Sequence, residues 1–471
     1  MKPKGKSRFI VVPSFHRPMR RGQGVSIAKA GMQGAGTVMH KVAIARFDGT
    51  VASLRQALAL SDAFEGLDPS CRILIKPNLV WGGAKKSPPF GVVTTGILVD
   101  HLLQLLREHG CRNVSIGEGT VVNKELGSST QRAFQWSGIG RVARKHGVPL
   151  VDFNAGTFGK ITLDGTGVLV AQAVLDSDII INVPVLKTHS QAMVTLGMKN
   201  LKGCLKITSK MKFHKKDLHG LIARLNTAVR PGITVIDGIY AMERGPEMSG
   251  RAHRRNLIIA GRDPLSCDMT GALALGIDPE EVPHLRTFAS LTGRRISMEG
   301  VEIAGMPLSE AVYPLPWKKD FEEAFRSSKI TGLTIQDPGD TFCSGCIILL
   351  TAFSAVFCKD HPGTALHGVE ICGGQEVHPL PDSSKVFLLG QCAISANKNL
   401  ENAIRIEGCP PSILDTVMKM NTKVLPKRKA AASLALRSLK NAGLKLGVYH
   451  ESFPLFGDYR SPDFDLSHFG K

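Results

Sequence analysis

The sequence predicts an α/β protein built on a parallel or mixed sheet with covering helices, followed by a small C-terminal cysteine-rich α/β domain. Over about 240 residues, short apolar runs rich in β-branched residues alternate with amphipathic stretches long enough for helices. This alternation is typical of parallel strands with helices packed on the faces of their sheet. The pattern changes near residue 335, and six of the ten cysteines lie between Cys343 and Cys409.

Length and composition suggest four segments. The 471 residues, 43% of them hydrophobic, are enough for two or three domains with real cores. The expected segments are a basic disordered tail at 1–38, an α/β domain at 39–335, a cysteine-rich domain at 336–425 and a basic helical tail at 426–471.

The net charge of +19 is concentrated at the two ends of the chain. Residues 1–40 and 419–445 each hold eight Lys or Arg and no acid, so sixteen of the nineteen excess charges lie there. No recognition helix or zinc-finger spacing accompanies them, so we expect no specific nucleic-acid partner; weak contact of the tails with nucleic acid or anionic lipid stays open. No apolar run is long enough for a transmembrane segment and no signal peptide is apparent, which predicts a cytoplasmic location.

Each element up to residue 154 has a local signal. The strand at 72–78 should end at Pro77, because proline cannot donate to a sheet ladder. The helix at 96–109 begins after a threonine cap and stops at Gly110. The other elements expected here are a strand at 42–47, a helix at 51–64, a strand and glycine turn at 114–120, a helix at 131–146 and a strand at 149–154.

The second half of the α/β domain continues the pattern. The run at 179–185 is apolar apart from Asn182, as in a strand buried on both faces. The lysine-rich stretch at 205–219 is interpreted either as a mobile basic lid or as a charged helix end. The other expected elements are a β excursion at 160–170, a strand beginning at 233, a strand at 257–260 and a helix from Asp263 or Ser266 to Leu275.

Polar and basic residues follow the apolar runs, at the strand ends where open α/β sheets bind their ligands. The densest set follows residue 185, where Gly197 and Gly203 alternate with lysines so that backbone amides and ammonium groups can converge on one anion. A merely solvated loop is the competing interpretation, and no Walker loop is present. The residues expected to bind an anionic small molecule are Lys76, Asn78, Lys187, Thr188, Asn200, Lys202 and Asp237.

Three residues are candidates for catalysis. His189 suits proton transfer near neutral pH, although burial would equally make it a structural hydrogen-bonding group. Glu118 lies in the G-E-G turn at 117–119 and is either an acid/base or a solvated turn residue; this turn lacks the third glycine of a dinucleotide fingerprint. Lys199 would neutralise and orient a carboxylate or phosphate.

The cysteines near the carboxyl end predict a metal centre. Cys343 and Cys346 form a C-x-x-C whose thiolates can ligate one centre, and Cys392 and Cys409 each follow a glycine closely. The spacing fits a 4Fe-4S cluster better than zinc, whose structural sites usually bring a second C-x-x-C. Zinc, a redox dithiol and unligated thiols stay open, and Cys358 and Cys372 are spare candidates.

The chain resembles the uncharacterised family catalogued as domain of unknown function 362. The resemblance implies an α/β domain working beside an iron–sulfur centre, since the G-Q-C and G-C-P-P cysteines are similar to a cluster-bearing extension on many members. The two-cluster ferredoxin segment that members often carry is missing here, which puts electron transfer through two clusters in doubt. The matching pieces are IKPN at 75–78, GEG at 117–119, INVPVLKTH at 181–189, GMKNLKG at 197–203 and VIDGI at 235–239.

These observations together predict an iron–sulfur enzyme, reductive in character, acting on an anionic small molecule at the Lys187–Lys202 loop and receiving electrons from a donor protein. One alternative is a hydratase or lyase whose cluster keeps an open iron position and only three thiolate ligands. Another is an electron carrier or metal-stabilised scaffold without a substrate of its own. Flavin binding stays open.

Overall fold

The computed structural model describes residues 39–82, 90–123, 127–245 and 250–424. The predicted tails at 1–38 and 426–471 lie outside the described residues. Every described helix and strand lies between His40 and Val424.

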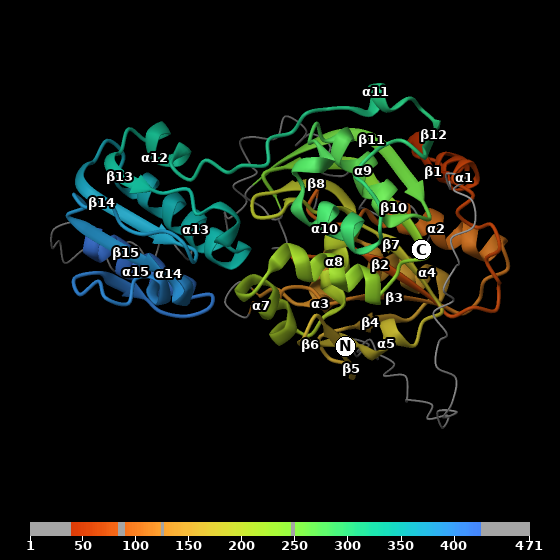
Figure 1. The fold of residues 1–471 in the computed structure, drawn as a ribbon, viewed down its shortest axis with the longest axis horizontal. Helices are drawn as coiled ribbons and strands as arrows, with labels where there is room; N and C mark the ends of the chain where they lie inside the picture. Colours follow the sequence, from red (N-terminus) through yellow and green to blue (C-terminus); the bar gives the residue numbers. More distant parts are fainter. Residues whose placement is uncertain (1–38, 83–89, 124–126, 246–249, 425–471) are drawn as a thin grey trace, which may run out of the picture. The chain divides into compact units, whose positions relative to one another are not determined.

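Ten strands of the described residues form one mainly parallel sheet (Figure 1), which confirms the predicted α/β class. On the main path of the sheet, the strand β11 runs antiparallel to its neighbours β1 and β10, and the other pairings are parallel. The strands in spatial order are β12 (Val301–Gly305), β1 (His40–Arg46), β11 (Arg251–Gly261), β10 (Ile233–Glu243), β7 (Ile179–Val183), β2 (Ile73–Pro77), β3 (Val114–Glu118) and β4 (Leu150–Asp152), with β8 (Val185–His189) paired to β10 and to β9 (Met193–Val194).

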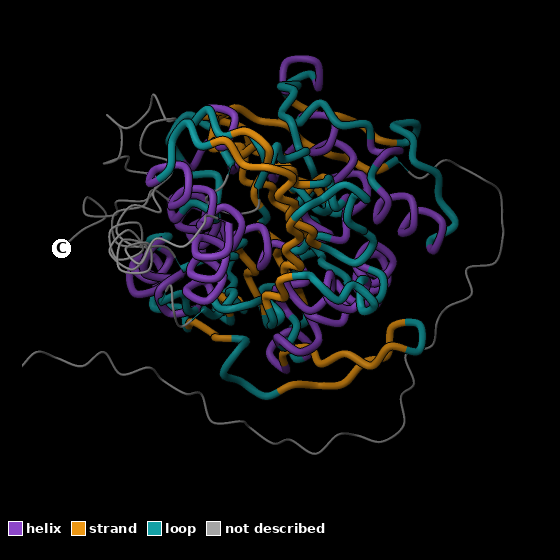
Figure 2. The backbone as a smooth tube through the Cα atoms, turned by 90° about the vertical axis from the view of Figure 1, so that its left-hand side faces the viewer, coloured by secondary structure: helices purple, strands orange, loops and turns teal. Residues whose placement is uncertain are grey.

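Helices cover both faces of this sheet, and Figure 2 shows strands running between helices. Successive residues of a strand point to opposite faces. Val42 and Ile44 of β1 accordingly join one apolar core, and Ala43 and Ala45 join the other. The helices on the face of the first core are α5 (Gln172–Leu175), α6 (Leu196–Asn200), η1 (Leu201–Cys204), α7 (Ile207–Lys215), α8 (Leu218–Ala228), α9 (Pro264–Ala274), η2 (Pro279–Glu281), α10 (Pro283–Leu291) and α11 (Leu308–Ala311). The helices on the face of the second core are α1 (Val51–Leu60), α2 (Gly96–Glu108), α3 (Thr130–Trp136) and α4 (Ile139–His146).

Most predicted elements are present, with altered ends. The helix expected at 131–146 is two helices, α3 and α4, because Gly138 between them has a φ of +80° that a continuing helix cannot hold. The expected β excursion is the hairpin of β5 (Phe158–Leu163) and β6 (Thr166–Ala171). The helix after β11 is capped by Asp263, whose carboxylate accepts the Ser266 amide, as predicted.

The interpretation of residues 187–189 as a loop was wrong. The strand predicted at 179–185 ends at Val183, and the chain re-enters the sheet after Pro184 as β8. The eleven-residue strand β10 makes this possible, because it pairs with β7 at its start and with β8 farther along. The polar residues that end β8 are therefore buried on a strand, and the sequence lacked a signal for this second pairing.

The basic stretch expected as a lid or a helix end forms the helix α7. Phe213 on this helix is fully buried in the first apolar core, so the second interpretation is the better description.

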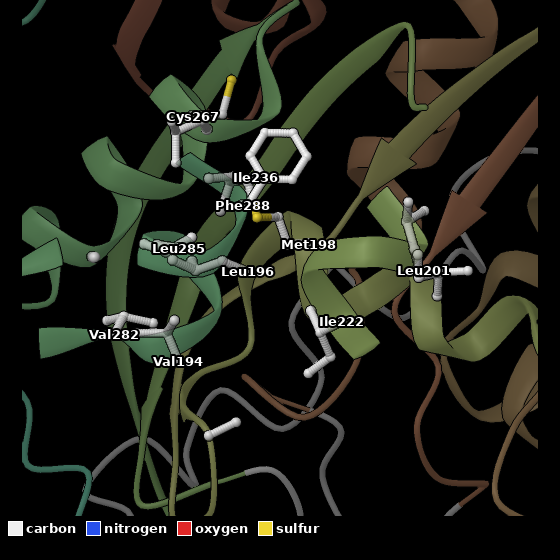
Figure 3. Close-up of a cluster of buried hydrophobic side chains, with 14 of the residues drawn as sticks. Val194, Leu196, Met198, Leu201, Ile222, Ile236, Cys267, Val282, Leu285 and Phe288 are labelled. Atoms are coloured by element: carbon white, nitrogen blue, oxygen red, sulfur yellow. The ribbon is translucent and has the colours of Figure 1, made fainter. Parts of the chain in front are cut away.

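Apolar side chains of the segment that carries Lys199 and Lys202 pack into the first core and hold the segment in place (Figure 3). Leu196, Met198 and Leu201 are fully buried in the first core. The same close-up places Ile222 of α8 and Leu285 of α10 in this cluster. The two lysines are only partly buried and alternate with these apolar anchors, so the helical spacing gives the segment one apolar and one basic side.

The cysteine-rich region forms a second, four-stranded parallel sheet with the order β13-β14-β15-β16. Because β13 pairs with β14, this sheet begins before the expected boundary at residue 336. No helix within the described ranges is both long and apolar enough to cross a membrane. The elements are α12 (Glu323–Ser327), β13 (Thr331–Ile335), η3 (Gly339–Thr341), α13 (Ser344–Asp360), β14 (Ala365–Gly373), β15 (Lys385–Leu389), α14 (Gly390–Ala396), β16 (Ile404–Ile406) and α15 (Ile413–Val424).

Candidate functional site

A buried ion pair joins the ends of β2 and β3. The Lys76 ammonium donates to Glu118 Oε2 at 2.7 Å, and the two side chains are 0% and 3% exposed. Glu118 also accepts hydrogen bonds from the backbone amides of Leu79 (2.9 Å) and Gly119 (2.7 Å). Both charges are thus compensated by protein groups, and the pair braces the strand ends.

Side-chain amides extend this pair into a network beneath the basic segment. Asn200 Oδ1 accepts from Lys76 Nζ at 3.0 Å and from Asn78 Nδ2 at 2.9 Å. Lys187 Nζ donates to Asn78 Oδ1 at 2.9 Å, and Asn200 Nδ2 donates to Asn182 Oδ1 at 2.8 Å. Four residues predicted to bind substrate therefore lie together, but they contact one another in the interior.

Gly203 has to be a glycine because the ion pair packs directly on it. A Cβ at this position would lie 2.4 Å from Glu118 Oε1 and 2.6 Å from Lys76 Nζ. We expect Gly203→Ala to lower the free energy of unfolding by about 1–3 kcal/mol in urea titrations, the usual cost of overpacking. Gly156→Ala is the control, since its nearest atom would be 3.7 Å away; equal stability of the two variants would contradict the close packing.

The backbone amides expected to hold a ligand anion hold a carboxylate of the protein instead. Asp268 of α9 accepts from the Gly197 amide at 2.7 Å and from the Met198 amide at 2.8 Å. Burial raises the pKa of Asp268 to about 7, although these two amides favour its charged form. Sequence reasoning missed Asp268; the available signal was a single acid inside the apolar run LSCDMTGALA.

His189 at the end of β8 is held in one tautomer. Its Nδ1 accepts hydrogen bonds from the backbone amides of Gln191 at 2.9 Å and of Ala192 at 3.2 Å. The ring proton must therefore lie on Nε2. Burial lowers the pKa of His189 well below its ordinary value, and the nearby charges of Lys199 and Lys187 lower it further. The ring is thus a neutral hydrogen-bond donor at physiological pH.

Lysines and histidines gather around this ring, and we call Lys187, His189, Lys199, Lys202 and His214 the basic site. Lys202 Nζ lies 2.5 Å from His214 Nε2. Burial lowers the pKa of Lys202 well below its usual range, and the charge of Lys199 adds to this effect. The pKa of His214 is lowered by burial and by both of these lysines. Sequence reasoning had placed His214 only in the lysine-rich stretch at 205–219, interpreted as a lid or a charged helix end.

Two hydroxyls beside the basic site have no hydrogen-bond partner in the described part of the chain: Ser190 Oγ and Thr195 Oγ1. Their residues are 9% and 3% exposed. The backbone holds Thr195 through its amide, which donates to the Lys187 carbonyl at 3.0 Å. Buried hydroxyls normally form hydrogen bonds, so two buried hydroxyls without a partner are unusual.

Asp237 and Thr188, which were also predicted to bind the substrate, form hydrogen bonds with other parts of the protein instead. Asp237 Oδ2 accepts from the amide (2.7 Å) and hydroxyl (2.9 Å) of Thr95, the residue preceding helix α2. A carboxylate is favourable at this end of a helix. Thr188 Oγ1 donates to the Pro316 carbonyl at 2.9 Å and accepts from the Arg244 amide at 2.7 Å.

Lys210 of α7 is a buried amine that donates to the Gly119 carbonyl. Burial lowers its pKa from 10.5 to about 8. Between pH 8 and 10.5 the unfolded chain holds a proton that the folded chain has lost, so stability rises with pH there. We expect the stability of the wild type relative to Lys210→Met to rise by up to about 3 kcal/mol over this interval. A stability difference that does not change with pH over this interval would contradict it.

The four predicted cysteine ligands come from three segments of the second sheet. Cys343 caps α13, Cys346 is in its first turn, Cys392 is in α14 and Cys409 precedes α15. The charges of Cys343, Cys392 and Cys409 all act to raise the pKa of Cys346, after its hydrogen bond with Cys343 and burial. This mutual influence indicates that the four thiols face a common region.

The environment of Cys343 favours a thiolate. The Cys346 thiol and the backbone amides of Cys346 and Gly345 stabilise the charged sulfur and lower its pKa. A Cβ on Gly390 would lie 3.1 Å from Cys346 Sγ, so this glycine leaves room beside the sulfur. The spare candidate Cys372 is buried in a separate apolar cluster.

Within the described residues, no three His, Cys, Asp or Glu side chains are spaced to hold a single metal ion. A 4Fe-4S cluster takes one thiolate on each iron, so its four sulfurs stand farther apart than the ligands of one zinc ion. Four thiols are the donor set that such a cluster uses.

The chain is similar to known proteins in sequence and in structure. A thylakoid-associated protein of Synechocystis sp. strain PCC 6803 is 27% identical over 242 residues, which span 50% of this chain and 73% of that protein. The lactate racemase apoprotein of Thermoanaerobacterium thermosaccharolyticum aligns with 86% of this chain and 90% of its own at 13% identity and a TM-score of 0.37, too weak a likeness to carry over a fold or an activity.

Part of the chain also matches a protein family. Residues 73–273 match the family model described as Domain of unknown function (DUF362). This range contains the five sequence pieces on which the resemblance was based, and it ends before Cys343, the first of the four predicted metal ligands. The resemblance to this family is confirmed over residues 73–273.

Proposed function

We propose that the chain is an iron–sulfur protein that binds an anionic small molecule at the basic site and reduces it. The observation that carries the proposal is the charge around His189. The strongest charge effects on its ring come from Lys199, Lys187, Lys202 and His214, all of them cationic or neutral bases. The neighbouring acids, Glu118 and Asp268, are already bound by protein donors. An anion would relieve this accumulation of basic groups.

The cysteines support the second half of the proposal. Cys343, Cys346, Cys392 and Cys409 would hold a 4Fe-4S cluster, which supplies electrons one at a time when bound. The lowered pKa of Cys343 keeps one ligand ready as a thiolate.

The protein's own residues would bind and orient the substrate. Lys199 and Lys202 neutralise its charge, and the Nε2–H of His189 donates a hydrogen bond to it. With Nδ1 occupied by two amides and a lowered pKa, His189 is better suited to donating a hydrogen bond than to exchanging a proton. The Lys76–Glu118 pair and Asn78 hold Lys187 in position.

The experiment is anaerobic reoxidation of the chemically reduced protein by a panel of small anions, followed by visible absorption. We expect at least one anion to reoxidise the wild type, and Lys199→Gln to be reoxidised more slowly at unchanged iron content. Lys212→Gln, which changes an exposed lysine of α7, is the matched control. Reoxidation only by a partner protein, unaffected by Lys199→Gln, would instead favour the electron carrier.

A hydratase or lyase is the second candidate because one cysteine differs from the rest. Cys409 is exposed, whereas the other three are partly buried. A cluster with one open iron needs only three thiolates. Retention of the cluster in Cys409→Ala, with no anion able to reoxidise the protein, would favour this alternative.

A further inference from the structure

Two histidines that the proposed reaction has not used face each other between α8 and α10. His219 and His284 are the second residues of these two helices. Their Nδ1 atoms lie 3.1 Å apart, and their rings stack with centroids 5.4 Å apart and an angle of 19° between the planes. His284 is fully buried, whereas His219 is 8% exposed. Of the two residues, His219 is therefore the one that reaches solvent.

The second ring nitrogen of His284 is unusual. Its Nε2 is buried and has no hydrogen-bond partner in the described part of the chain. Buried ring nitrogens normally form hydrogen bonds. A histidine that served only to pair with His219 would gain nothing from burying this second polar atom, so we look for a bound molecule that it contacts.

Helix α8 is tied to the segment that carries Lys199. Asn226 of α8 donates a hydrogen bond from its Nδ2 to the carbonyl of Met198, the residue before Lys199, at 2.9 Å. The charge of Lys199 acts on the ring of His284 and also on the ring of His189. The histidine pair therefore adjoins the basic site.

The segments around His284 and Thr195 belong to one apolar cluster. Figure 3 shows Val282, two residues before the histidine, together with Val194, which precedes the threonine. Like His284 Nε2, the hydroxyl of Thr195 is buried and has no partner within the described residues. Two unsatisfied polar atoms thus occur on segments that pack in the same cluster, and a ligand that makes hydrogen bonds would satisfy both.

The hydrogen bond between the two Nδ1 atoms fixes the tautomers of the pair, because only one of these atoms can carry the proton. In a neutral pair, the ring that accepts this bond carries its own proton on Nε2, and the ring that donates has a bare Nε2. Burial lowers the pKa of His284 well below its ordinary value, and the charges of His219 and Lys199 lower it further. His284 is therefore neutral at physiological pH.

From this arrangement we infer that His284 is the proton donor of the basic site and that His219 is its positioning residue. The inference rests on the proposed function, because the reduction of an oxyanion consumes protons. His189 is poorly suited to supply them, since two backbone amides occupy its Nδ1. A proton enters the pair at His219 and reaches the bound anion from Nε2 of His284.

The transfer leaves both rings neutral. At the start, His219 carries its proton on Nδ1 and His284 carries its proton on Nε2. The Nε2–H bond of His284 breaks as its proton bonds to the substrate atom that has gained an electron from the reduced protein. The Nδ1 proton of His219 moves to His284 Nδ1, and His219 Nε2 takes a proton from solvent. No charge is created in the interior, where it would be costly.

The pair is reset after the product leaves. Water that enters the site gives a proton to His284 Nε2, and the reverse movement through the two Nδ1 atoms returns a proton from His219 to solvent. The starting tautomers are thereby restored, and each ring is again neutral.

The tautomers and the contact with the anion are tested by nuclear magnetic resonance of the anaerobically purified full chain at pH 7, with nitrogen-15 in its histidines. We expect two neutral rings of opposite tautomer, identified by their loss in His219→Phe and His284→Gln. Phosphate or malonate should shift the Nε2 resonance of His284. Two identical tautomers, an imidazolium in the pair, or an Nε2 resonance that neither anion moves would overturn the inference.

Variants separate proton transfer from binding. The amide of His284→Gln can form a hydrogen bond to an anion near the position of Nε2 but cannot pass on a proton. We expect its reoxidation rate at saturating anion to fall by about 10²-fold or more, while the anion concentration that gives half of the maximal rate changes little. A wild-type rate in this variant would overturn the assignment of the donor.

His219→Phe keeps the ring stacking but removes the nitrogen that holds His284. We expect it to slow the same step by a smaller factor and to leave His284 as a mixture of tautomers, which a merely structural role would not cause. His101→Phe is the matched control, because His101 is a buried histidine of α2 on the other face of the sheet. It should change neither the rate nor the tautomers, and a loss of rate equal to that of His219→Phe would overturn the role of His219.

The outcomes distinguish this inference from the proposed function. Reoxidation by an anion at the same rate in the wild type and in His284→Gln would overturn the inference and leave the proposed function standing. Failure of every anion to reoxidise the protein would defeat the proposed function, while a His284 resonance shifted by phosphate or malonate would still support the histidine pair as a part of the basic site.

Discussion

Removing one partner of the Lys76–Glu118 pair is expected to destabilise the protein by about 3–5 kcal/mol, because the remaining charge would stay buried without compensation. Lys76→Met and Glu118→Gln are the variants, and urea unfolding followed by circular dichroism is the measurement. Glu118→Gln should be the milder of the two, since its amide oxygen can still accept one of the backbone amides that now bind the carboxylate.

The double variant Lys76→Met/Glu118→Leu is the control for this prediction. Replacing both charges with apolar groups should recover much of the lost stability, because neither side chain then needs a counter-ion. The alternative is that Glu118 acts as a catalytic acid or base with little structural role. In that case Glu118→Gln would abolish activity and leave the free energy of unfolding unchanged.

Substitution of Cys343 is expected to have the largest effect on metal content. Cys343→Ser should lose most of its iron, because this residue supplies the thiolate that the first turn of α13 stabilises. Cys358→Ser is the matched control: Cys358 lies at the other end of the same helix, and it should keep the iron of the wild type. Iron and sulfide analysis after anaerobic purification checks both.

Equal iron content in the two variants would contradict the assigned ligand set. Loss of iron from Cys358→Ser but not from Cys343→Ser would exchange the roles of the two residues.

The fold was predictable because its signals are local. Pro77 marks the end of β2, Asp263 caps α9, and the apolar runs have the lengths of buried strands. Gly138 shows the limit of this reasoning. Its left-handed conformation breaks a helix that periodicity alone extends from 131 to 146.

The sequence predicted which residues lie at the candidate site but not how they contact one another. Lys76, Asn78, Lys187 and Asn200 do lie together, yet they form a closed network whose long-range pairings leave no periodic trace. Asp268 could not be connected to Gly197 because 71 residues separate them in the chain. Which lysines remain for a ligand depends on such pairings.

For the cysteines, the sequence predicted that the segments carrying them come together, but it does not determine which metal they bind. The C-x-x-C spacing, Gly390 and Gly408 pointed to one centre, and the fold brings the corresponding segments together through the Gln391 amide, which donates to the Gly408 carbonyl at 2.9 Å. The identity of the metal depends on sulfur chemistry rather than on the chain path.

Iron and acid-labile sulfide analysis of the anaerobically purified chain, with visible and electron paramagnetic resonance spectra, tests the central claim most directly. The account predicts about four irons and about four sulfides per chain, with visible absorption that reduction bleaches. Stoichiometric zinc without visible absorption would contradict the iron–sulfur assignment and leave the basic site as the remaining functional centre.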